Sequence, residues 1–172
     1  AKAQQILALR VRGRVGPLEL VLAAGAGLNA TRVLLLLEEK AELELMQVLL
    51  AEGTSAHSHV LEVHLGQEAQ LHHGVLATAD GGSSLMAHLA VEQEPRSSYA
   101  LTSVVQGWTL GRVEPRVVQV DGQAETVLTQ VWLSPAPSSS WPPTERCALT
   151  RAGGGARSVA QMPGRRPVPR DF

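Results

Sequence analysis

The sequence has one cysteine and few aromatic residues, and both shortages restrict the sites that the chain can build. Cys147 is the only cysteine among 172 residues, which excludes an internal disulfide and a thiolate-rich zinc or cluster site made by this chain alone. Phe, Trp and Tyr together make up 3% of the residues, whereas 44% of the residues are hydrophobic. We therefore expect one domain in a reducing compartment, with a core of Leu, Val and Ala instead of a ring-lined ligand pocket.

An excess of charge and long hydrophobic runs are also missing. The net charge of −1 and the pI of about 6.7 provide no basic field that would hold nucleic acid or an anionic membrane surface. The apolar run at residues 33–37 is far shorter than the roughly 20 residues that cross a bilayer. The first residues, AKAQQILALRVRGR, do not have the pattern of a secretory signal. We expect a soluble, cytoplasmic protein with no nucleic-acid or membrane partner.

Most catalytic motifs are absent, because the sequence has no GxxxxGK before Ser or Thr, no HExxH, no CxxC and no GxSxG. We therefore expect that the chain is not an enzyme. One glycine motif is present, since Gly25, Gly27 and Ala30 fit GxGxxA after the apolar residues 18–22. Ahead of a helix such a turn binds the pyrophosphate of a dinucleotide, with Glu42 or Glu44 available for the ribose. The alternatives are a fragment of a dinucleotide-binding oxidoreductase and a loop between two strands.

A repeat of about 28 residues organises the chain up to residue 133. Small residues at Ala41, Ala69, Ser97 and Ala124 are separated by 28, 28 and 27 positions, and each lies in a polar turn between two apolar runs. This recurring pattern of strand, turn and strand predicts a β-solenoid, in which each coil contacts only its neighbours. Such an array has an open end wherever it stops, and we expect something to cover that end.

The clearest strand lies at residues 61–65, where Leu61, Val63 and Leu65 alternate with polar residues and share one face. Residues 34–50 are less distinct, since their apolar residues also fit one stripe of a helix and are good helix formers. We favour strands there because stacked coils must share one conformation to bury a continuous core. A helix at residues 34–50 would contradict this interpretation.

The composition changes abruptly after Leu133. Residues 1–133 have nine Lys and Arg against fourteen Asp and Glu, whereas residues 134–172 have six Arg against two acidic residues and seven of the ten prolines. We divide the chain into a solenoid core at 1–133 and a Pro-, Arg- and Gly-rich tail at 134–172, which we expect to be irregular. The tail is interpreted as disordered, as a ligand for acidic or aromatic-lined partners, or, as we favour, as the product of out-of-frame translation.

Histidines are concentrated in one part of the repeat. On a strand His57 and His59 point to the same side, so they could hold two corners of a metal site, with His72 or His73 as a third ligand. The sequence shows no Asp or Glu placed to accept a hydrogen bond from these histidines, as the outer residues of a metal site would. The alternative is that the imidazoles face solvent or form hydrogen bonds in the core. We therefore assign no catalytic, cofactor-binding or metal-binding residue. Cys147 lies in the tail without a fixed partner, and we interpret it as a bystander.

Four short motifs follow one another in register with the repeat. They are a Gly ahead of Ala and Leu, a Gln-x-x-Arg-Ser turn, a Gly before Leu-x-Arg, and a strand that ends in Gly. The positions are Gly66, Ala69, Leu71, Gln93, Arg96, Ser97, Gly107, Leu110, Arg112 and Gly122. In this order they resemble the SufB/SufD family of iron–sulfur cluster assembly proteins, and SufD more than SufB, over residues 20–133. The sequence departs from the family pattern at Trp108, Val113 and Gln130, which are loop and strand-end positions.

The resemblance implies a right-handed parallel β-helix, here incomplete, that serves as a scaffold subunit of the SufBCD complex. Its partners would be a SufB-like subunit and, through a C-terminal helical region, a SufC-like ATPase. The iron–sulfur cluster would belong to the complex, because no cluster ligand or ATPase contact of the family has a counterpart after Leu133. We therefore interpret the chain as a truncated SufD-like protein that binds no cofactor itself. A carbohydrate-binding β-solenoid is a further alternative, although Tyr99, Trp108 and Trp132 are too few for an aromatic platform.

Overall fold

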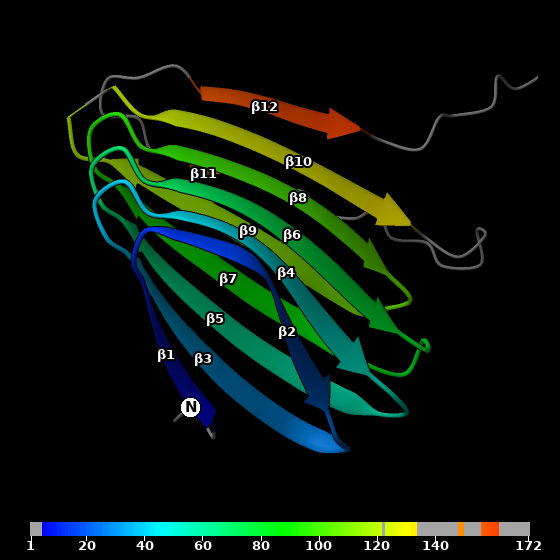
Figure 1. The fold of residues 1–172 in the computed structure, drawn as a ribbon. Coiled ribbons are helices and arrows are strands. Elements are labelled where there is room, and N and C mark those ends of the chain that lie inside the picture. The colour runs from blue at the N-terminus through cyan, green and yellow to red at the C-terminus, as the bar shows by residue number, and fades with distance from the viewer. Residues whose placement is uncertain (1–4, 122, 134–147, 150–155, 162–172) are drawn as a thin grey trace, which may run out of the picture.

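The computed structural model describes residues 5–121, 123–133, 148–149 and 156–161, and the only regular structure within them is β-strand (Figure 1). The strands are β1 (Gln5–Val11), β2 (Arg14–Ala24), β3 (Gly27–Leu37), β4 (Glu42–Ala51), β5 (Ser55–Leu65), β6 (Gln70–Ala79), β7 (Ser84–Gln93), β8 (Ser98–Gln106), β9 (Leu110–Gln119), β10 (Glu125–Leu133), β11 (Ala148–Leu149) and β12 (Ala156–Gln161). A search of this part of the chain finds no helix that is long and apolar enough to cross a membrane.

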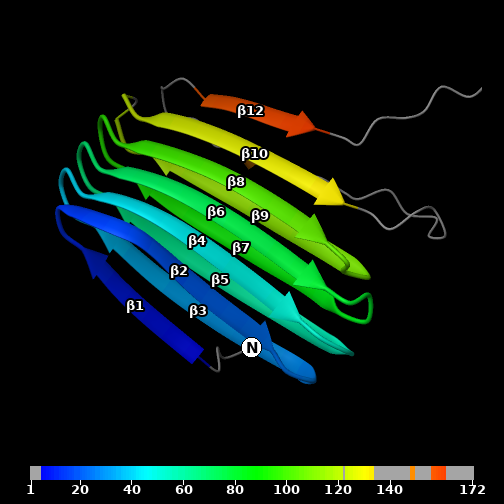
Figure 2. The same cartoon turned by 45° about the vertical axis from the view of Figure 1, so that its right-hand side comes forward.

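The strands alternate between two parallel sheets, and the chain winds through them as a flattened right-handed coil (Figures 1 and 2). Sheet A consists of β1, β3, β5, β7, β9 and β11, in that order, and sheet B consists of β2, β4, β6, β8, β10 and β12. Each strand pairs with the strand two places later along the chain, because a tight turn carries the backbone to the opposite sheet in between. The predicted parallel β-solenoid is confirmed.

The turns from sheet A to sheet B bury the small residues that define the repeat. Their exposed fractions are 0%, 0%, 1% and 3%, at Ala41, Ala69, Ser97 and Ala124. Three of these turns close with a backbone hydrogen bond to the residue three positions earlier, which the amides of Ala41, Ala69 and Ser97 donate at 3.0, 3.0 and 3.2 Å. Because each of these residues fills a position inside the coil, a larger side chain would displace the neighbouring coils.

Residues 34–50, which also fit a helical stripe, form strands. β3 ends at Leu37 and β4 begins at Glu42, with the turn between them. Leu35 and Leu37 face the interior with exposed fractions of 2% and 0%, whereas Leu36 is 37% exposed on the outer face. β3 pairs with β1 on one side and β5 on the other, so tertiary pairing overrides the local helix propensity of these residues.

The GxGxxA motif lies in a turn between two strands. Gly25 follows the end of β2, and Gly27 begins β3 with a φ of 87°, a conformation that glycine adopts without strain. Ala30 lies within β3. The residues from Gly27 to Leu37 are a strand, so the helix N-terminus that a dinucleotide site requires is not formed after this motif. Of the two alternatives for this motif, the structure therefore shows the turn between two strands, β2 and β3.

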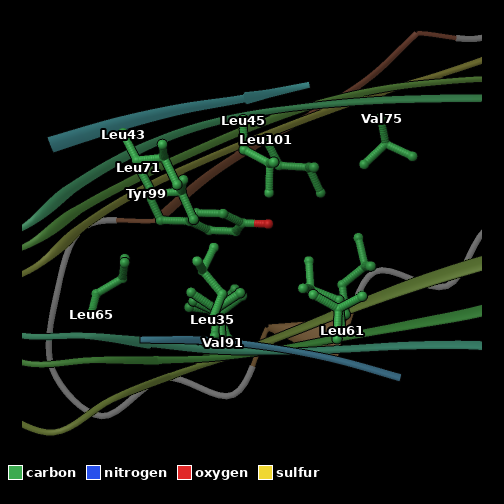
Figure 3. Close-up of a cluster of buried hydrophobic side chains, with 14 of the residues drawn as sticks. Leu35, Leu43, Leu45, Leu61, Leu65, Leu71, Val75, Val91, Tyr99 and Leu101 are labelled. Atoms are coloured by element: carbon green, nitrogen blue, oxygen red, sulfur yellow. The ribbon is translucent and has the colours of Figure 1, made fainter. Parts of the chain in front are cut away.

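Side chains that point inward stack in columns from one coil to the next. In sheet A, Leu61, Val63 and Leu65 share the inner face, with exposed fractions of 0%, 4% and 0%. In sheet B, Leu71 pairs with Tyr99 and stacks beside it in the same column. Figure 3 shows the ring of Tyr99 in the space between the two sheets, surrounded by Leu and Val side chains. The core is therefore aliphatic, as the composition predicts, with one fully buried aromatic ring.

β1 and β2 stand at one end of the two sheets, and the inner face is less covered there (Figure 2). Leu18, Leu20 and Leu22 point inward from β2 but are only partly buried, because no further coil of the described residues stacks on them. At the other end, β11 and β12 pair with β9 and β10 through their backbones. The predicted boundary at Ser134, Cys147 and the remainder of the tail lie outside the described residues.

Candidate functional site: a polar chain in the solenoid interior

Six polar side chains form a continuous hydrogen-bonded chain between the two sheets. Sheet A contributes Thr31 from β3 and His57 and His59 from β5, and sheet B contributes Gln47 from β4, His73 from β6 and Tyr99 from β8. The polar residues come from three neighbouring coils, because every coil places the same strand positions over the same part of the interior.

The sheet A half of the chain is centred on the Thr31 hydroxyl. The Oγ1 atom of Thr31 lies 2.8 Å from Nδ1 of His59 and 3.4 Å from Nε2 of His57. Thr31 pairs with His59 in the sheet, so the two side chains occupy the same column in adjacent coils. The two imidazole rings themselves meet edge to face, with centroids 6.2 Å apart. Both rings are buried, with exposed fractions of 2% for His57 and 0% for His59.

The sheet B half is joined to it by the Gln47 amide. The Nε2 atom of Gln47 lies 2.9 Å from Nε2 of His59, and its Oε1 atom lies 3.3 Å from Nε2 of His73. The other nitrogen of His73, Nδ1, lies 3.1 Å from the hydroxyl of Tyr99. Gln47, His73 and Tyr99 are each at most 2% exposed, so water does not replace these partners.

These contacts assign one direction of hydrogen-bond donation along the whole polar chain, from Tyr99 at one end to His57 at the other. Gln47 donates from Nε2 to His59, so Nε2 of His59 accepts and its Nδ1 carries the hydrogen that it donates to Thr31. At the other end, Gln47 accepts from Nε2 of His73, whose Nδ1 accepts from Tyr99. His59 and His73 therefore each donate through one nitrogen and accept through the other, which is the pattern of a neutral ring.

Burial favours the same neutral state. Desolvation, together with the nearby His57, lowers the pKa of His59 from 6.5 to about 4. Desolvation, together with His59, lowers the pKa of His73 to about 3. Desolvation also lowers the pKa of His57 and raises that of the Tyr99 hydroxyl. At neutral pH the interior therefore contains no ionised member of this chain.

The chain ends at a nitrogen of His57. Among the described residues, no hydrogen-bond partner meets His57 Nδ1, which is buried. The direction of donation makes this atom an N–H donor, because His57 accepts at Nε2 from the Thr31 hydroxyl. A buried donor without a partner costs roughly 1–3 kcal/mol, so this end of the chain is its least stable point.

The histidines that were candidate metal ligands separate into two groups. His57, His59 and His73 face the interior, whereas His72 faces solvent from the outer face of sheet B. The strand geometry thus distinguishes between His72 and His73, the two candidates for a third metal ligand. His73 is the one that belongs to the hydrogen-bonded polar chain. In the described part of the protein, no group of three or more His, Cys, Asp or Glu side chains is placed to hold a metal ion. Both nitrogens of His59 and both nitrogens of His73 are occupied with hydrogen bonds to Thr31, Gln47 and Tyr99.

Three members of the chain were not candidates in the sequence. No sequence pattern linked Thr31, Gln47 or Tyr99 to the histidines, and their place beside them follows from the strand register. A signal was nevertheless present for one of them, because Thr31 and His59 are one repeat of 28 residues apart. Tyr99 is buried, and Trp108 and Trp132 pack against the core, so these three rings do not form an exposed platform for a sugar.

A second polar cluster lies at the turn end of the later coils. The Oγ1 atom of Thr126 bonds Oε1 of Gln93 at 2.5 Å and receives a bond from Nε2 of Gln119 at 3.1 Å. Gln93 also donates to the Glu125 carbonyl at 3.1 Å. These amides close the ends of strands by satisfying backbone carbonyls, so we assign this cluster to stability.

The outer face of sheet A is hollowed by a groove of about 850 Å³ that runs across β1, β3, β5, β7 and β9. Apolar side chains such as Leu34 and Leu36 line it together with charged ones. Charges at the groove are paired, since Arg32 contacts Glu62 at 2.6 Å and Arg10 contacts Glu38 at 2.5 Å. The groove therefore presents no strong field of one sign.

Comparison with known families gives a match that covers most of the solenoid. The family model described as SUF system FeS cluster assembly, SufBD core domain, matches residues 20–137. The matched segment spans every strand from β3 to β10 and all residues of the polar chain. Comparison with the curated proteins finds no match, and comparison with the solved structures finds none.

Proposed function

Because this chain belongs to the SufB/SufD family of iron–sulfur cluster assembly proteins, we propose that it acts as a SufD-like, non-enzymatic scaffold subunit in cluster assembly and transfer. The observation that carries the proposal is the match to the SufBD core domain over residues 20–137, more than half of the 172-residue chain. The parallel solenoid supports it, because stacked coils form a rigid rod that presents fixed side-chain columns to partners.

A scaffold role agrees with the chemistry of the described interior. The polar chain consists of neutral groups that bond one another, and none of them is a thiolate. Thiolates are the usual ligands of iron–sulfur clusters. The cluster is therefore treated as the cargo of the assembly, and most of its ligands would come from a partner.

The partners follow from the family as proposals. We infer that a SufB-like subunit pairs with this chain and that a SufC-like ATPase joins the complex through the SufB-like subunit. The described residues contain no helix, so a direct ATPase contact would have to use strands, turns or residues outside the described part. A cytoplasmic site of action is part of the same proposal.

Co-expression tests this function directly. The affinity-tagged chain is produced together with a SufB-like and a SufC-like subunit and purified through its tag. We expect the SufB-like subunit to co-elute with it, and the SufC-like ATPase to co-elute only when the SufB-like subunit is present. Cluster loading of the purified complex is read from visible absorption. Purification of the chain alone, with cluster loading of the SufB-like subunit unchanged by its presence, would refute the proposal.

A further inference from the structure

A glycine leaves a depression on the outer face of sheet B. Gly74 of β6 occupies an outward-facing position and pairs with Met46 of β4 on one side and Thr102 of β8 on the other. Figure 2 shows these three strands side by side. The depression has a volume of about 410 Å³, and Glu44, Met46 and His72 are part of its lining. These three side chains are exposed, so the depression opens to solvent.

The sulfur atom of Met46 lies over this glycine. A Cβ atom added at Gly74 would be 2.7 Å from Sδ of Met46, so the thioether occupies space that any other residue at position 74 would fill. Met46 is nevertheless 44% exposed and flexible, so its sulfur can turn toward a ligand in the depression. A soft donor atom, which proteins usually bury, is therefore accessible here.

His72 and Glu44 bring a nitrogen and an oxygen donor to the same depression. They pair with each other across β6 and β4, and they share the outer face because Glu44 is two residues before Met46 and His72 is two residues before Gly74. Paired residues of adjacent strands are about 4.8 Å apart, and residues two positions apart on one strand are about 6.6 Å apart, so side chains of this length can meet above Gly74. Among the described residues, neither Glu44 nor His72 has a side-chain hydrogen bond or an ion pair. Two donors without partners therefore stand beside the Met46 sulfur.

The surroundings of Met46 favour a cation. The strands β2, β4, β6 and β8 contain a single Lys or Arg, which is Arg14, and it contacts Glu42 at 3.1 Å. Glu44 lies two residues before Met46 in β4, and Glu19 pairs with Met46 from β2. Glu19 and Glu44 are exposed, and neither forms an ion pair with a described residue. A positive ion beside Met46 would therefore meet negative charge on two sides.

We propose that Met46, His72 and Glu44 form a surface site for a cuprous ion, Cu(I). Thioether sulfur selects this soft ion, imidazole nitrogen is a further good copper ligand, and the carboxylate adds a compensating charge. Harder cations such as Mg²⁺ and Ca²⁺ prefer sets of oxygen ligands, which these three side chains do not supply. Because one of its ligands is a methionine, the site is not one of the groups of three His, Cys, Asp or Glu residues, which the described part of the protein lacks. The proposal goes beyond the scaffold role and does not depend on which subunits assemble.

Sheet A carries the same two residue types in different surroundings. Met86 and His88 lie two residues apart on the outer face of β7, and Met86 is 55% exposed. Met86 pairs with Ser58 and Arg112, so it has a guanidinium group beside it instead of a glycine. Met86 and His88 therefore test whether copper binding requires the depression at Gly74 or only an exposed methionine and a nearby histidine.

Competition with a coloured Cu(I) chelator tests the proposal with the full chain. Every protein contains the substitution Cys147→Ser, because the thiolate of the single cysteine would bind Cu(I) in place of the site. Cu(I) is added without oxygen, and the copper left on the chelator is read from visible absorption. We compare Met46→Leu and His72→Gln with the sheet A controls Met86→Leu and His88→Gln.

We expect each chain to bind one Cu(I), with Met46→Leu and His72→Gln each weakening binding about tenfold or more and the two controls less than about twofold. Gly74→Ala keeps every donor but displaces the Met46 sulfur, and we expect it to weaken binding about threefold. Circular dichroism confirms that each variant is folded. Equal effects of the sheet B and sheet A substitutions, or binding that Met46→Leu leaves unchanged, would overturn the proposal.

Nuclear magnetic resonance provides a second measurement that needs no substitution in the site. The methyl carbon of Met46 is attached to the sulfur, so one equivalent of Cu(I) should shift its signal while the methyl signal of Met86 stays in place. A shift of the Met86 signal alone, or of neither signal, would contradict the assignment of copper to this depression.

Discussion

The Nδ1 atom of His73 lies 3.1 Å from the hydroxyl oxygen of Tyr99, 26 residues further along the chain. The two residues are diagonal neighbours in sheet B, because His73 pairs with Leu101 and Tyr99 pairs with Leu71. Both side chains are buried, with exposed fractions of 2% and 0%. The stacking of the coils thus creates a polar contact that neither strand would make alone, and this contact can be tested separately from the fold.

Removing one partner of this contact should cost more than removing both. His73→Leu matches Leu45 and Leu101 in the same column but leaves the Tyr99 hydroxyl without its partner, so we expect a loss of about 2–3 kcal/mol in unfolding free energy. Adding Tyr99→Phe removes the orphaned hydroxyl and should recover about 1 kcal/mol. Urea denaturation of the two single variants and the double variant measures the coupling. Strictly additive effects would show that the contact contributes nothing.

The buried histidines should make the protein sensitive to mild acid. The pKa of His59 is lowered to about 4 and that of His73 to about 3, whereas both are near 6.5 in the unfolded chain, so the unfolded state binds protons first. The contribution of neutral His59 and His73 to the free energy of unfolding is therefore fully present above pH 6.5. It decreases as the pH falls below 6.5, by about 2 kcal/mol for each of the two residues at pH 5.

Comparing a variant that lacks His73 with the natural chain tests whether the buried histidines cause this loss of stability in acid. The carboxylates with lowered pKa values, such as Glu38 beside Arg12 and Glu68 beside Arg96, lose their contribution only below about pH 4.5. The double variant H73L/Y99F retains His57 and His59, so between pH 7.5 and pH 5 it should lose about 2 kcal/mol less stability than the natural chain. Denaturation at both pH values gives the comparison, and an unchanged loss in the double variant would contradict the assignment.

Glycine at position 66 is required by the close approach of two coils. A Cβ atom there would lie 2.9 Å from the backbone carbon of Glu38 in the preceding turn. We expect Gly66→Ala to destabilise the protein by about 1–3 kcal/mol. Gly25→Ala is the matched control, since a Cβ atom at Gly25 meets nothing within 4 Å, and it should be nearly neutral. Thermal melting of the two variants tests the stacking, and equal melting temperatures would contradict it.

The turn residue Lys40 is held in a left-handed conformation with a φ of 59°. A side chain there costs roughly 1–2 kcal/mol, and the exposed contact with Glu39 at 2.9 Å offsets little of that cost. We expect Lys40→Gly to stabilise the protein by about 1 kcal/mol, whereas Lys40→Ala retains the strained conformation and should not. Urea denaturation measures both variants. A Gly variant that is no more stable than the Ala variant would show that the turn is not strained.

The fold was predictable because the coil strongly restricts the size and the polarity of the residues that make up its repeat. Ala41 and Ala69 fill the same buried turn position in successive coils, and larger side chains do not fit there. Leu61, Val63 and Leu65 alternate as a strand with one buried face requires. Residues 34–50 were ambiguous because local propensity favours a helix there, and only pairing with neighbouring coils makes them strands.

The site was predictable only in part. Strand periodicity places His57 and His59 on one face, but it does not say whether that face is the interior or the solvent. The choice between His72 and His73 depends on the register of β6 against β4, which sets His73 opposite Leu45. Gln47 joins the two sheets through a contact across the interior, and the width of that space is determined by packing instead of by sequence spacing. The sequence therefore indicates the histidines but not their partners.

Native mass spectrometry of purified components tests the central claim of this account most directly. The full chain is mixed with a SufB-like subunit at physiological ionic strength, with the SufB-like subunit alone as the control. We predict a species that contains both chains, and a dissociation constant low enough for the complex to persist at micromolar concentrations. Detection of only the separate chains, while the SufB-like subunit forms its own assemblies as in the control, would contradict the claim that this solenoid is a subunit of the assembly.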